Sequence, residues 1–311
     1  MKIKLSILLS FFLFTAFFGG KKWSPLLDKN LSQWDIYLSY PDKSQNFEGL
    51  PRDADGKYTE PIGLNKDKWG VFTVKEENGE PVLHVSGEIY GAVSTKKEFE
   101  NYHLKLQVKW GEKTFAPRKT EPMNSGLHYN AVGPHGADYW KTWMRGQECQ
   151  IMQGRFGDYW SQAGGMVDVR AAKQADGTYV YSKDAPLVSF GGSEKAGGYV
   201  ARIQDFEKPK GEWNTVELIN FEGKSLHIIN GQVAMALENS RQMVDGKEVP
   251  LRKGKIELQC EGAELFFKNI EIRELKKLPG KYKQFFSPQS GSPQSAVGAA
   301  TTAQTVDWRT E

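Results

Sequence analysis

Residues 214–235 read NTVELINFEGKSLHIINGQVAM, and this stretch decides the fold. Apolar and polar side chains alternate along residues 215–219 and again along 225–229, which is the pattern of strands with one buried and one solvated face. The turn dipeptides Glu222-Gly223 and Asn230-Gly231 follow these two runs. The stretch therefore predicts consecutive antiparallel strands joined by tight hairpin turns.

The same pattern extends over residues 23–275. Alternation recurs at 82–86, 103–110 and 255–259, and outside the N-terminal segment no stretch keeps a helical period. Further turn dipeptides divide the chain into about a dozen short strands. These dipeptides are Asn78-Gly79, Asp176-Gly177 and Asp245-Gly246. We therefore predict one all-β domain over 23–275, a two-sheet antiparallel jelly-roll sandwich of the concanavalin A-like lectin and glucanase type.

Composition excludes several classes of protein. The 311 residues include 39% hydrophobic and 25% charged residues, which is ordinary for a globular protein, and the formal net charge is only +3. That balance supports neither nucleic-acid binding nor attachment to a membrane surface, and the composition excludes a coiled coil, a collagen and a polytopic membrane protein. Cys149 and Cys260 occupy inward-facing strand positions. We interpret them as buried free thiols; a single disulfide is the alternative, and two cysteines without a spaced histidine pair make no zinc site.

The N-terminus has the pattern of an export signal. Lys2 and Lys4 precede an apolar run at 5–18, which is shorter than the roughly 20 residues of a membrane-spanning helix. We expect residues 1–20 to be a signal peptide, the protein to be periplasmic or extracellular, and the mature chain to have no membrane span. A retained anchor is the alternative, because no clear small-x-small cleavage site follows. No cysteine follows the run, so a cysteine-anchored lipoprotein is excluded.

Two other segments depart from the strand pattern. Residues 41–68 are polar, rich in Gly and Pro, and too long for a hairpin, so we expect an insertion loop. Residues 276–311 are expected to be a low-complexity, disordered tail, because the part from 287 onward has almost no large apolar side chains.

Candidate functional residues concentrate in 124–160. If 147–152 is a strand, Cys149 and Ile151 face the core, while Glu148 and Gln150 project to the opposite, open face. On the preceding candidate strand, alternation places Leu127 and Tyr129 inward and His128 and Asn130 outward. A carboxylate, an amide and an imidazole on one concave face suit acid–base chemistry on a sugar. A wet sheet face with incidental polar residues explains the pattern equally well.

Aromatic side chains strengthen the sugar-binding interpretation. Trp140, Trp143 and Trp160 flank the Glu148 strand in glycine-rich segments. Exposed tryptophan is costly unless it packs or binds a flat ligand, and sugar rings present apolar faces that stack on it. Some of these rings are also expected to cap the core. His135, close to Asp138 in a Gly-Pro-His-Gly loop, is a candidate for substrate binding or for holding a metal. Residues 257, 259 and 261 (Glu, Gln, Glu) form a second polar row.

Ordered motifs across 23–275 resemble the 3-keto-disaccharide hydrolase family. They are LLDKNLSQW at 26–34, NSGLH at 124–128, ECQI at 148–151, GEWNT at 211–215, NG at 230–231, and GKIELQCEG at 254–262 with FKNI at 267–270. The resemblance implies a concanavalin A-like sandwich and a glycoside substrate oxidised at C3. The sequence departs from the commonest family pattern in its long 41–68 loop and in Gln153, where many relatives place an aspartate.

A ketone at C3 makes the C2 proton acidic, so a single base can start elimination of the C1 substituent, and water can then add back. We assign Glu148 as the general base or acid and His128 as a proton donor or enolate stabiliser. Gln150 and Asn124 are then hydroxyl-binding residues. A divalent cation could also polarise the ketone, but the sequence assigns no ligands to it.

Two other functions compete with this one. A lectin-like module that binds carbohydrate without catalysis would suit the aromatic loops. A conventional endoglycanase needs two carboxylates, and the Glu148 strand offers only one, since Gln150 and Met152 follow it. Oligomeric state, glycan linkage and metal requirement are not predicted by the sequence.

Overall fold

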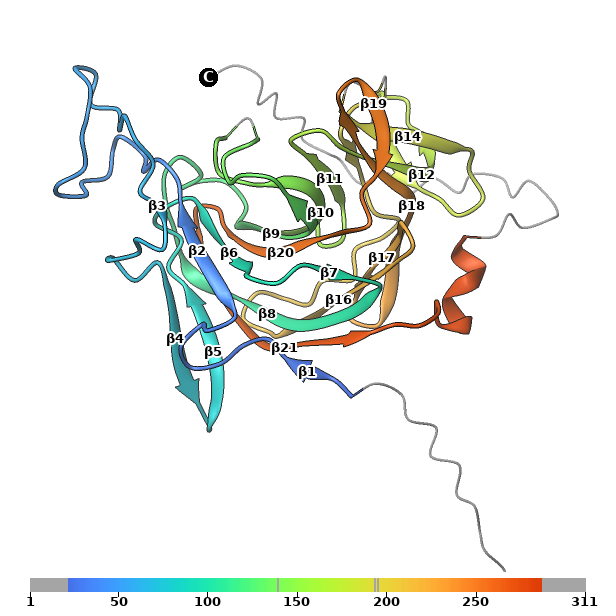
Figure 1. The fold of residues 1–311 in the computed structure, drawn as a ribbon, viewed down its shortest axis with the longest axis horizontal. Helices are drawn as coiled ribbons and strands as arrows, with labels where there is room; N and C mark the ends of the chain where they lie inside the picture. Colours follow the sequence, from blue (N-terminus) through green and yellow to red (C-terminus); the bar gives the residue numbers. More distant parts are fainter. Residues whose placement is uncertain (1–21, 139, 193, 195, 287–311) are drawn as a thin grey trace, which may run out of the picture.

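The computed structural model describes residues 22–286 apart from positions 139, 193 and 195. The predicted all-β sandwich is confirmed: two sheets stack face to face, and their ladders are antiparallel (Figure 1). Within the described residues, no helix has the length and apolarity to cross a lipid bilayer. The predicted signal segment 1–20 lies outside the described residues, as does the tail from 287 onward.

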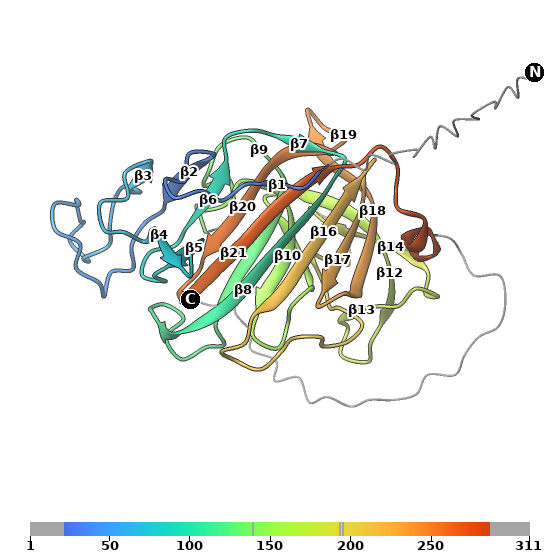
Figure 2. The same ribbon diagram turned by 90° about the horizontal axis from the view of Figure 1, so that it is seen from below.

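The twelve-stranded sheet is called the outer sheet. Its strands are β1 (Ser24–Pro25), β4 (Phe72–Glu77), β5 (Glu80–Val85), β8 (Tyr102–Thr114), β12 (Gly165–Lys173), β13 (Tyr179–Tyr181), β14 (Leu187–Gly191), β16 (Asn214–Phe221), β17 (Lys224–Ile229), β18 (Gln232–Val244), β19 (Lys247–Pro250) and β21 (Ala263–Glu274). In Figure 1 it runs from β21, β8 and β16 at the bottom up to β18, β12 and β14 at the upper right. The central order is β12-β18-β17-β16-β8-β21-β5-β4. Figure 2, from below, shows β21, β8, β16 and β17 crossing this layer side by side.

The nine-stranded sheet, called the inner sheet, carries the candidate site. Its strands are β2 (Trp34–Leu38), β3 (Gly63–Leu64), β6 (Gly91–Thr95), β7 (Phe99–Glu100), β9 (Asn124–Val132), β10 (Arg145–Met152), β11 (Tyr159–Gln162), β15 (Tyr199–Val200) and β20 (Lys253–Cys260). They run in the order β15-β11-β10-β9-β20-β6-β2-β3, and β7 pairs with β20. One face packs on the outer sheet. The other is the open face, which looks upward in Figure 1.

The core lies between the sheets and follows the predicted alternation. Leu127, Cys149 and Ile151 of the inner sheet are buried against side chains of the outer sheet such as Leu106 and Leu218. Cys149 and Cys260 are buried free thiols, as expected. The turn at Asn230-Gly231 has positive φ at both residues, 49° and 80°, which matches the twist of the β17–β18 hairpin.

Asn130 departs from the predicted alternation of inward and outward side chains. Its φ of +51° and the register shifts on both sides of β9 mark a β-bulge, which turns Asn130 inward. There its side-chain amide donates to the carbonyl of Leu251 at 3.0 Å and pairs with Asn220 of the outer sheet. The prediction that Asn130 shares the open face with His128 is therefore wrong, because the extra residue changes the face after Tyr129.

The folded region extends beyond the predicted boundary at 275. A 3-10 helix, η1 (Gly280–Phe285), follows β21, and its Tyr282 is buried in a second apolar cluster with Leu226 and Ile228. Residues 276–286 are thus part of the packed structure, which corrects the start of the predicted tail. Apolar positions 278, 282, 285 and 286 supply the burial that the low-complexity interpretation overlooked.

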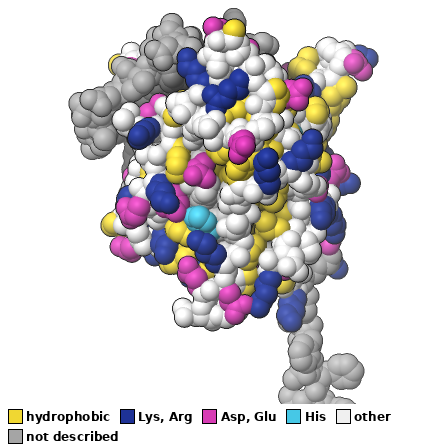
Figure 3. Space-filling model, turned by 90° about the vertical axis from the view of Figure 1, so that its left-hand side faces the viewer, with side chains coloured by type: hydrophobic (Ala, Val, Ile, Leu, Met, Phe, Trp, Pro, Cys, Tyr) yellow, Lys and Arg dark blue, Asp and Glu magenta, His cyan; other side chains and the backbone are white. Residues whose placement is uncertain are grey.

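The surface carries charges of both signs. On the side shown in Figure 3, Lys and Arg side chains alternate with Asp and Glu, and apolar side chains gather in bands between them. The 41–68 segment is a loop as expected, with only the short β3 and an isolated bridge between Arg52 and Tyr58.

Candidate active site

Three neighbouring strands at the centre of the inner sheet supply the site. Glu148 and Gln150 of β10 project to the open face, and β9 places His128 directly opposite Glu148. This juxtaposition was predicted from the alternation. On the other side of β9, Glu257 of β20 is also paired with His128. The register therefore aligns a carboxylate, an imidazole and a second carboxylate across three strands.

His128 lies between the two carboxylates. Its Nε2 is 3.3 Å from Glu148 Oε2 and its Nδ1 is 3.2 Å from Glu257 Oε2, while the side chain is fully buried. Burial alone would lower the pKa of His128, but the charges and hydrogen bonds of Glu148 and Glu257 raise it to about 10. The ring is therefore an imidazolium at neutral pH. The side-chain amide of Gln259 lies 2.5 Å from the same Nε2 of His128.

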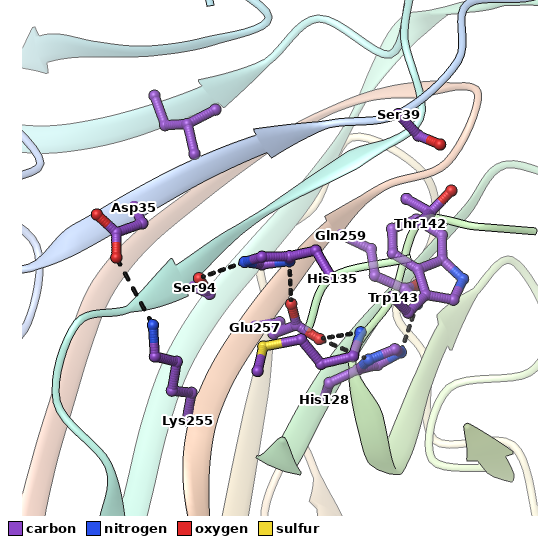
Figure 4. Close-up of polar contacts among 12 residues, drawn as sticks. Asp35, Ser39, Ser94, His128, His135, Thr142, Trp143, Lys255, Glu257 and Gln259 are labelled. Atoms are coloured by element: carbon purple, nitrogen blue, oxygen red, sulfur yellow. Dashed lines mark hydrogen bonds and ion pairs between the residues drawn. The ribbon is translucent and has the colours of Figure 1, made fainter. Parts of the chain in front are cut away.

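Glu257 also contacts the loop between β9 and β10, called the covering loop, which carries His135 and Met144. Figure 4 shows His135 and His128 on opposite sides of the Glu257 carboxylate. His135 Nδ1 is 3.3 Å from Oε1, and the backbone N–H of Met144 donates to Oε2 at 3.2 Å. Burial raises the pKa of Glu257, but the hydrogen bonds and charges of the two histidines outweigh it and hold the pKa at about 2. Glu257 is a permanent carboxylate in a fully buried position.

The carboxylate of Glu148 lies over Gly126 of the neighbouring strand β9. The side-chain amide of Gln162 donates to Glu148 Oε2 at 2.6 Å. Its other oxygen occupies space that exists only because residue 126 is glycine: a Cβ there would clash with Glu148 Oε1 and with Gln259 Oε1. Gly126 thus leaves room for two polar side chains to meet over the middle of β9.

A third carboxylate, Glu261, follows the end of β20. Burial raises the pKa of Glu261 to about 7; Arg118, whose Nη1 is 3.6 Å from Oε1, opposes the shift, and the charge of Glu148 adds to it. Asn124 donates to Glu261 and accepts a 2.5 Å hydrogen bond from the Gln150 amide. Glu261 therefore exchanges a proton near neutral pH, as a general acid must.

Glu257 and Glu261 were not predicted as site residues from the sequence. The alternating row at 257, 259 and 261 was the available signal, but the partner strand was unknown. With the two strands adjacent, the open face holds three carboxylates rather than one. The prediction of a single carboxylate holds only for the Glu148 strand itself.

The tryptophans have different roles. Trp143 is 1% exposed and packs edge to face on His128, with ring centroids 5.7 Å apart, so it forms the wall behind the imidazolium. It offers no face to a sugar, which corrects its predicted role. Trp140 is 48% exposed on the covering loop. Trp160, half-buried on β11, lies directly opposite Glu148 and packs on Tyr199.

His135 and Asp138 do not form a pair. Asp138 accepts hydrogen bonds from the backbone N–H groups of Trp140, Thr142 and Trp143, which fixes the turn of its own loop. His135 instead stacks on Tyr37 at 4.6 Å and faces Glu257. Among the described residues no cluster of three His, Cys, Asp or Glu side chains is arranged to hold a metal ion. A protonated His128 is also a poor ligand, since both ring nitrogens carry hydrogen.

The open face is drier than predicted. Glu148 is 2% exposed and His128 is fully buried, so a wet face with incidental polar residues does not describe them. Exposure rises along the strands to 12% for the Glu261 side chain, which places the accessible end of the site near Asn124 and Glu261. A surface pocket of about 400 Å³ lies elsewhere, beside Trp34 and Phe72.

Comparisons with known proteins identify the family. The family model described as the 3-keto-alpha-glucoside-1,2-lyase-like domain matches residues 22–273. Among solved structures, a "putative glycosyl hydrolase" of Parabacteroides distasonis is 20% identical with a TM-score of 0.43, and the alignment covers 82% of this chain and 100% of that one. A Bacillus licheniformis beta-glucanase is 10% identical with a TM-score of 0.35, over 83% and 100% of the two chains.

No curated protein matches the sequence. Both TM-scores are below 0.5, so the assignment depends on the family match, which confirms the resemblance found in the ordered motifs. The chain belongs to the 3-keto-alpha-glucoside-1,2-lyase-like domain family, and is therefore a carbohydrate-active protein.

Proposed function

We propose that this protein cleaves glycosides that carry a ketone at C3, by elimination across C1 and C2 followed by addition of water. The observation that carries the proposal is the buried imidazolium of His128 between two carboxylates, one of which, Glu148, reaches the open face of the sheet. Such an arrangement stabilises charge in a water-poor site, where electrostatic interactions are strongest.

Glu148 is the base in this scheme. The C3 ketone acidifies the C2 proton, which passes to the Glu148 carboxylate while the C–H electron pair forms an enolate. His128 acts through its charge, which offsets the negative charge of the enolate. Because both of its nitrogens are engaged with protein groups, His128 is a positioning residue rather than a direct proton donor.

Glu261 is the acid. When the enolate collapses, the C1–O bond breaks and the leaving oxygen needs a proton. Glu261 is near the accessible end of the site, and its pKa of about 7 leaves a protonated fraction at neutral pH. Addition of water across the new C1–C2 double bond gives the free 3-keto sugar, so the net reaction is hydrolysis. In this scheme Gln150 and Asn124, which are hydrogen-bonded to each other, bind sugar hydroxyls.

A conventional two-carboxylate glycosidase is the second candidate. The position of Glu261 beyond Glu148 on the same face favours it, since an acid of raised pKa and a second carboxylate are the two groups that such an enzyme needs. A non-catalytic lectin has no use for a buried imidazolium held by two carboxylates.

The test offers the mature protein plain and 3-keto forms of the same glucose disaccharide. Cleavage of the keto form alone supports the proposal, whereas cleavage of the plain form supports a conventional glycosidase. Binding of either form without turnover would contradict both enzymatic functions. Running the keto reaction in D₂O adds a second readout, because elimination through C2 places deuterium at C2 of recovered substrate or product.

The proposal includes export to the periplasm or beyond. It is supported by the sequence pattern of residues 1–20, with two lysines before the apolar run. N-terminal sequencing of protein recovered from the periplasm or medium is expected to begin near residue 21. Exported material that begins at Met1 would contradict cleavage of the segment.

A further inference from the structure

The segment between β8 and β9 brings a guanidinium to Glu261. The backbone N–H of Phe115 donates to the carbonyl of Gly262 at 2.8 Å, and a Cβ at position 262 would lie only 3.3 Å from the Cβ of Arg118. The φ of Gly262 is +76°, which also favours glycine there. Because residue 262 has no side chain, the segment packs directly against the end of β20, and this packing fixes Arg118 beside the proposed acid.

The guanidinium of Arg118 is shared between two carboxylates. Its Nη2 is 2.9 Å from Oε2 of Glu121, whereas its Nη1 is 3.6 Å from Oε1 of Glu261. Within the described residues, the buried Nε has no hydrogen-bond partner, so the contacts with carboxylates run through Nη1 and Nη2. The Glu121 side chain is 48% exposed and that of Glu261 only 12%. The more buried carboxylate therefore has the longer contact.

Further groups face Glu261 from the inner sheet and from the segment before β6. They are Asn124, His128, Glu148 and Tyr90. The hydrogen bond from the amide and the charge of the imidazolium favour the carboxylate form of Glu261, and the charge of the neighbouring carboxylate opposes it. Burial raises the pKa of the Tyr90 phenol, which therefore stays uncharged. Burial also raises the pKa of Glu261, and the charge of Arg118 is the largest of the influences that lower it.

We propose that Arg118 is a positioning residue for the acid: its guanidinium, divided between Glu121 and Glu261, sets how firmly Glu261 holds the proton that the leaving oxygen receives. This inference rests on the proposed function, in which Glu261 is the acid, and adds how that site is regulated. Glu121 holds the guanidinium at the shorter distance and offsets part of its charge. Loss of Glu121 leaves more of that charge to Glu261, and loss of Arg118 leaves none, so the two substitutions act in opposite directions.

The experiment follows the Glu261 carboxyl by ¹³C NMR in the substrate-free protein from pH 5 to 9, with its resonance assigned by its absence from Glu261→Gln. The wild-type midpoint is expected at about 7. In Arg118→Met, which removes the charge and keeps a long side chain, the midpoint is expected to rise by about one pH unit. In Glu121→Gln it is expected to fall by about half a unit. A wild-type midpoint in either variant, or shifts in the same direction, would overturn the proposal.

Lys119→Gln and Glu112→Gln are the matched controls. Lys119 is the exposed neighbour of Arg118, so its loss removes one positive charge from the same segment. Glu112 is an exposed carboxylate paired with Lys210 at 2.9 Å. Neither control is expected to move the midpoint by more than about 0.2 unit, because exposed charges are screened by water and salt. Control shifts as large as those of Arg118→Met and Glu121→Gln would overturn the specific role of Arg118.

Glu121→Gln keeps the test decisive if Arg118→Met fails to fold. Glu121 and Glu112 are both exposed, so their substitution by glutamine leaves the packed core unchanged. A midpoint that falls in Glu121→Gln and stays constant in Glu112→Gln supports the proposal. A midpoint that stays constant or rises in Glu121→Gln contradicts it.

Turnover is the second readout. Since the acid must be protonated, the decline of kcat/KM at high pH is expected to move upward in Arg118→Met and downward in Glu121→Gln, in step with the NMR midpoints. A purely structural role would lower kcat/KM at every pH without moving the decline, and that result would overturn the proposal. If the wild type cleaves no 3-keto glycoside, the proposed function fails, and the NMR midpoints still test the division of the guanidinium.

Discussion

Two fully buried histidines of this protein differ in charge, since His128 is a cation and His227 is neutral. His128, on the open face of the inner sheet, has its pKa raised to about 10, whereas burial lowers the pKa of His227, in the core between the sheets, to about 4. His227 donates from Nδ1 to the carbonyl of Gly157 at 3.0 Å and pairs through Nε2 with the Tyr129 hydroxyl at 3.1 Å. Neutral partners keep it neutral, and two carboxylates keep His128 charged.

The pKa values of Glu257 on β20 and of Glu261, which directly follows β20, differ in the same way. Glu257, between two histidines, has its pKa held at about 2, while burial raises the pKa of Glu261 to about 7 despite Arg118. Burial is shared by all four groups. The partners that the sheet register brings to each group therefore decide whether it is a fixed charge or a proton carrier.

The largest expected effect comes from removing one of the two carboxylates beside His128. Glu148→Gln keeps the shape and cannot accept a proton, so turnover of a 3-keto disaccharide is expected to fall by roughly 10²–10⁴-fold. Since Glu148 is 2% exposed and faces an imidazolium, some loss of stability is expected too, on the order of 1–3 kcal/mol. The measurements are steady-state kinetics and denaturant unfolding.

Glu217→Gln is the matched control for Glu148→Gln. Glu217 accepts a 2.7 Å hydrogen bond from His103 on the outer sheet. The substitution therefore also removes a carboxylate bound to a histidine, but at a position outside the open face. Turnover of this variant should match the wild type. Near-normal turnover of Glu148→Gln would remove Glu148 from the mechanism.

Removing the proton carrier is expected to have the next largest effect. Glu261→Gln should lower turnover by about 100-fold and change the pH profile. If Glu261 is the acid, wild-type kcat falls as pH rises through about 7, because the carboxyl then loses its proton. The variant should lack that decline, as measured by kcat from pH 5 to 9. A decline near pH 7 that survives in Glu261→Gln would assign it to another group.

Gly126→Ala tests the geometry of the row without changing any charge. The φ of Gly126 is not in the left-handed region, so alanine fits the strand, but its Cβ would displace Glu148 Oε1 and Gln259 Oε1. Turnover is expected to fall about ten-fold with little change in stability, because misplacement of a catalytic group by about 1 Å is costly.

Gly111→Ala is the control for this displacement. A Cβ at position 111 would push the carboxylate of Glu264, the partner of His84 on the outer sheet. It imposes the same kind of displacement outside the site, so turnover should be unchanged. Equal turnover in both alanine variants would show that the position of Glu148 over Gly126 does not matter.

The sequence predicted the fold and one strand of the site for the same reason. Period-two alternation is a local signal, so it placed Glu148 and Gln150 on the face opposite to Cys149 and Ile151. It failed at Asn130, because a bulge changes the face by one residue and leaves no mark in hydrophobicity.

The remainder of the site depends on contacts between distant parts of the chain. Glu257 reaches His128 across 129 residues of sequence, and only the strand order makes them neighbours. His135 and Asp138 show the opposite error, because two residues close in sequence do not form a pair. The Asp138 carboxylate accepts hydrogen bonds from the backbone of its own loop instead. Depth of burial was also not predictable, because it depends on how the loop with Trp143 folds over the strands.

The prediction with the smallest effect on turnover concerns the pH dependence of stability. His128 has a folded pKa of about 10, above its ordinary value of 6.5, so its contribution is fully present below pH 6.5 and is lost as pH rises toward 10. His227 has a folded pKa of about 4, below 6.5; the unfolded chain therefore takes up the proton first, and stability is lost as pH falls from 6.5 toward 4. Glu261, with its pKa raised to about 7, contributes with the opposite sign over the acid range, so each decline is measured as the difference in unfolding free energy between wild type and variant from pH 4.5 to 10, above the range in which Glu257 titrates. His227→Gln should flatten the acid decline and leave turnover within about two-fold, whereas His128→Gln should flatten the alkaline decline and impair turnover. Identical pH dependence in the two variants would contradict the assignment of a charged His128 and a neutral His227.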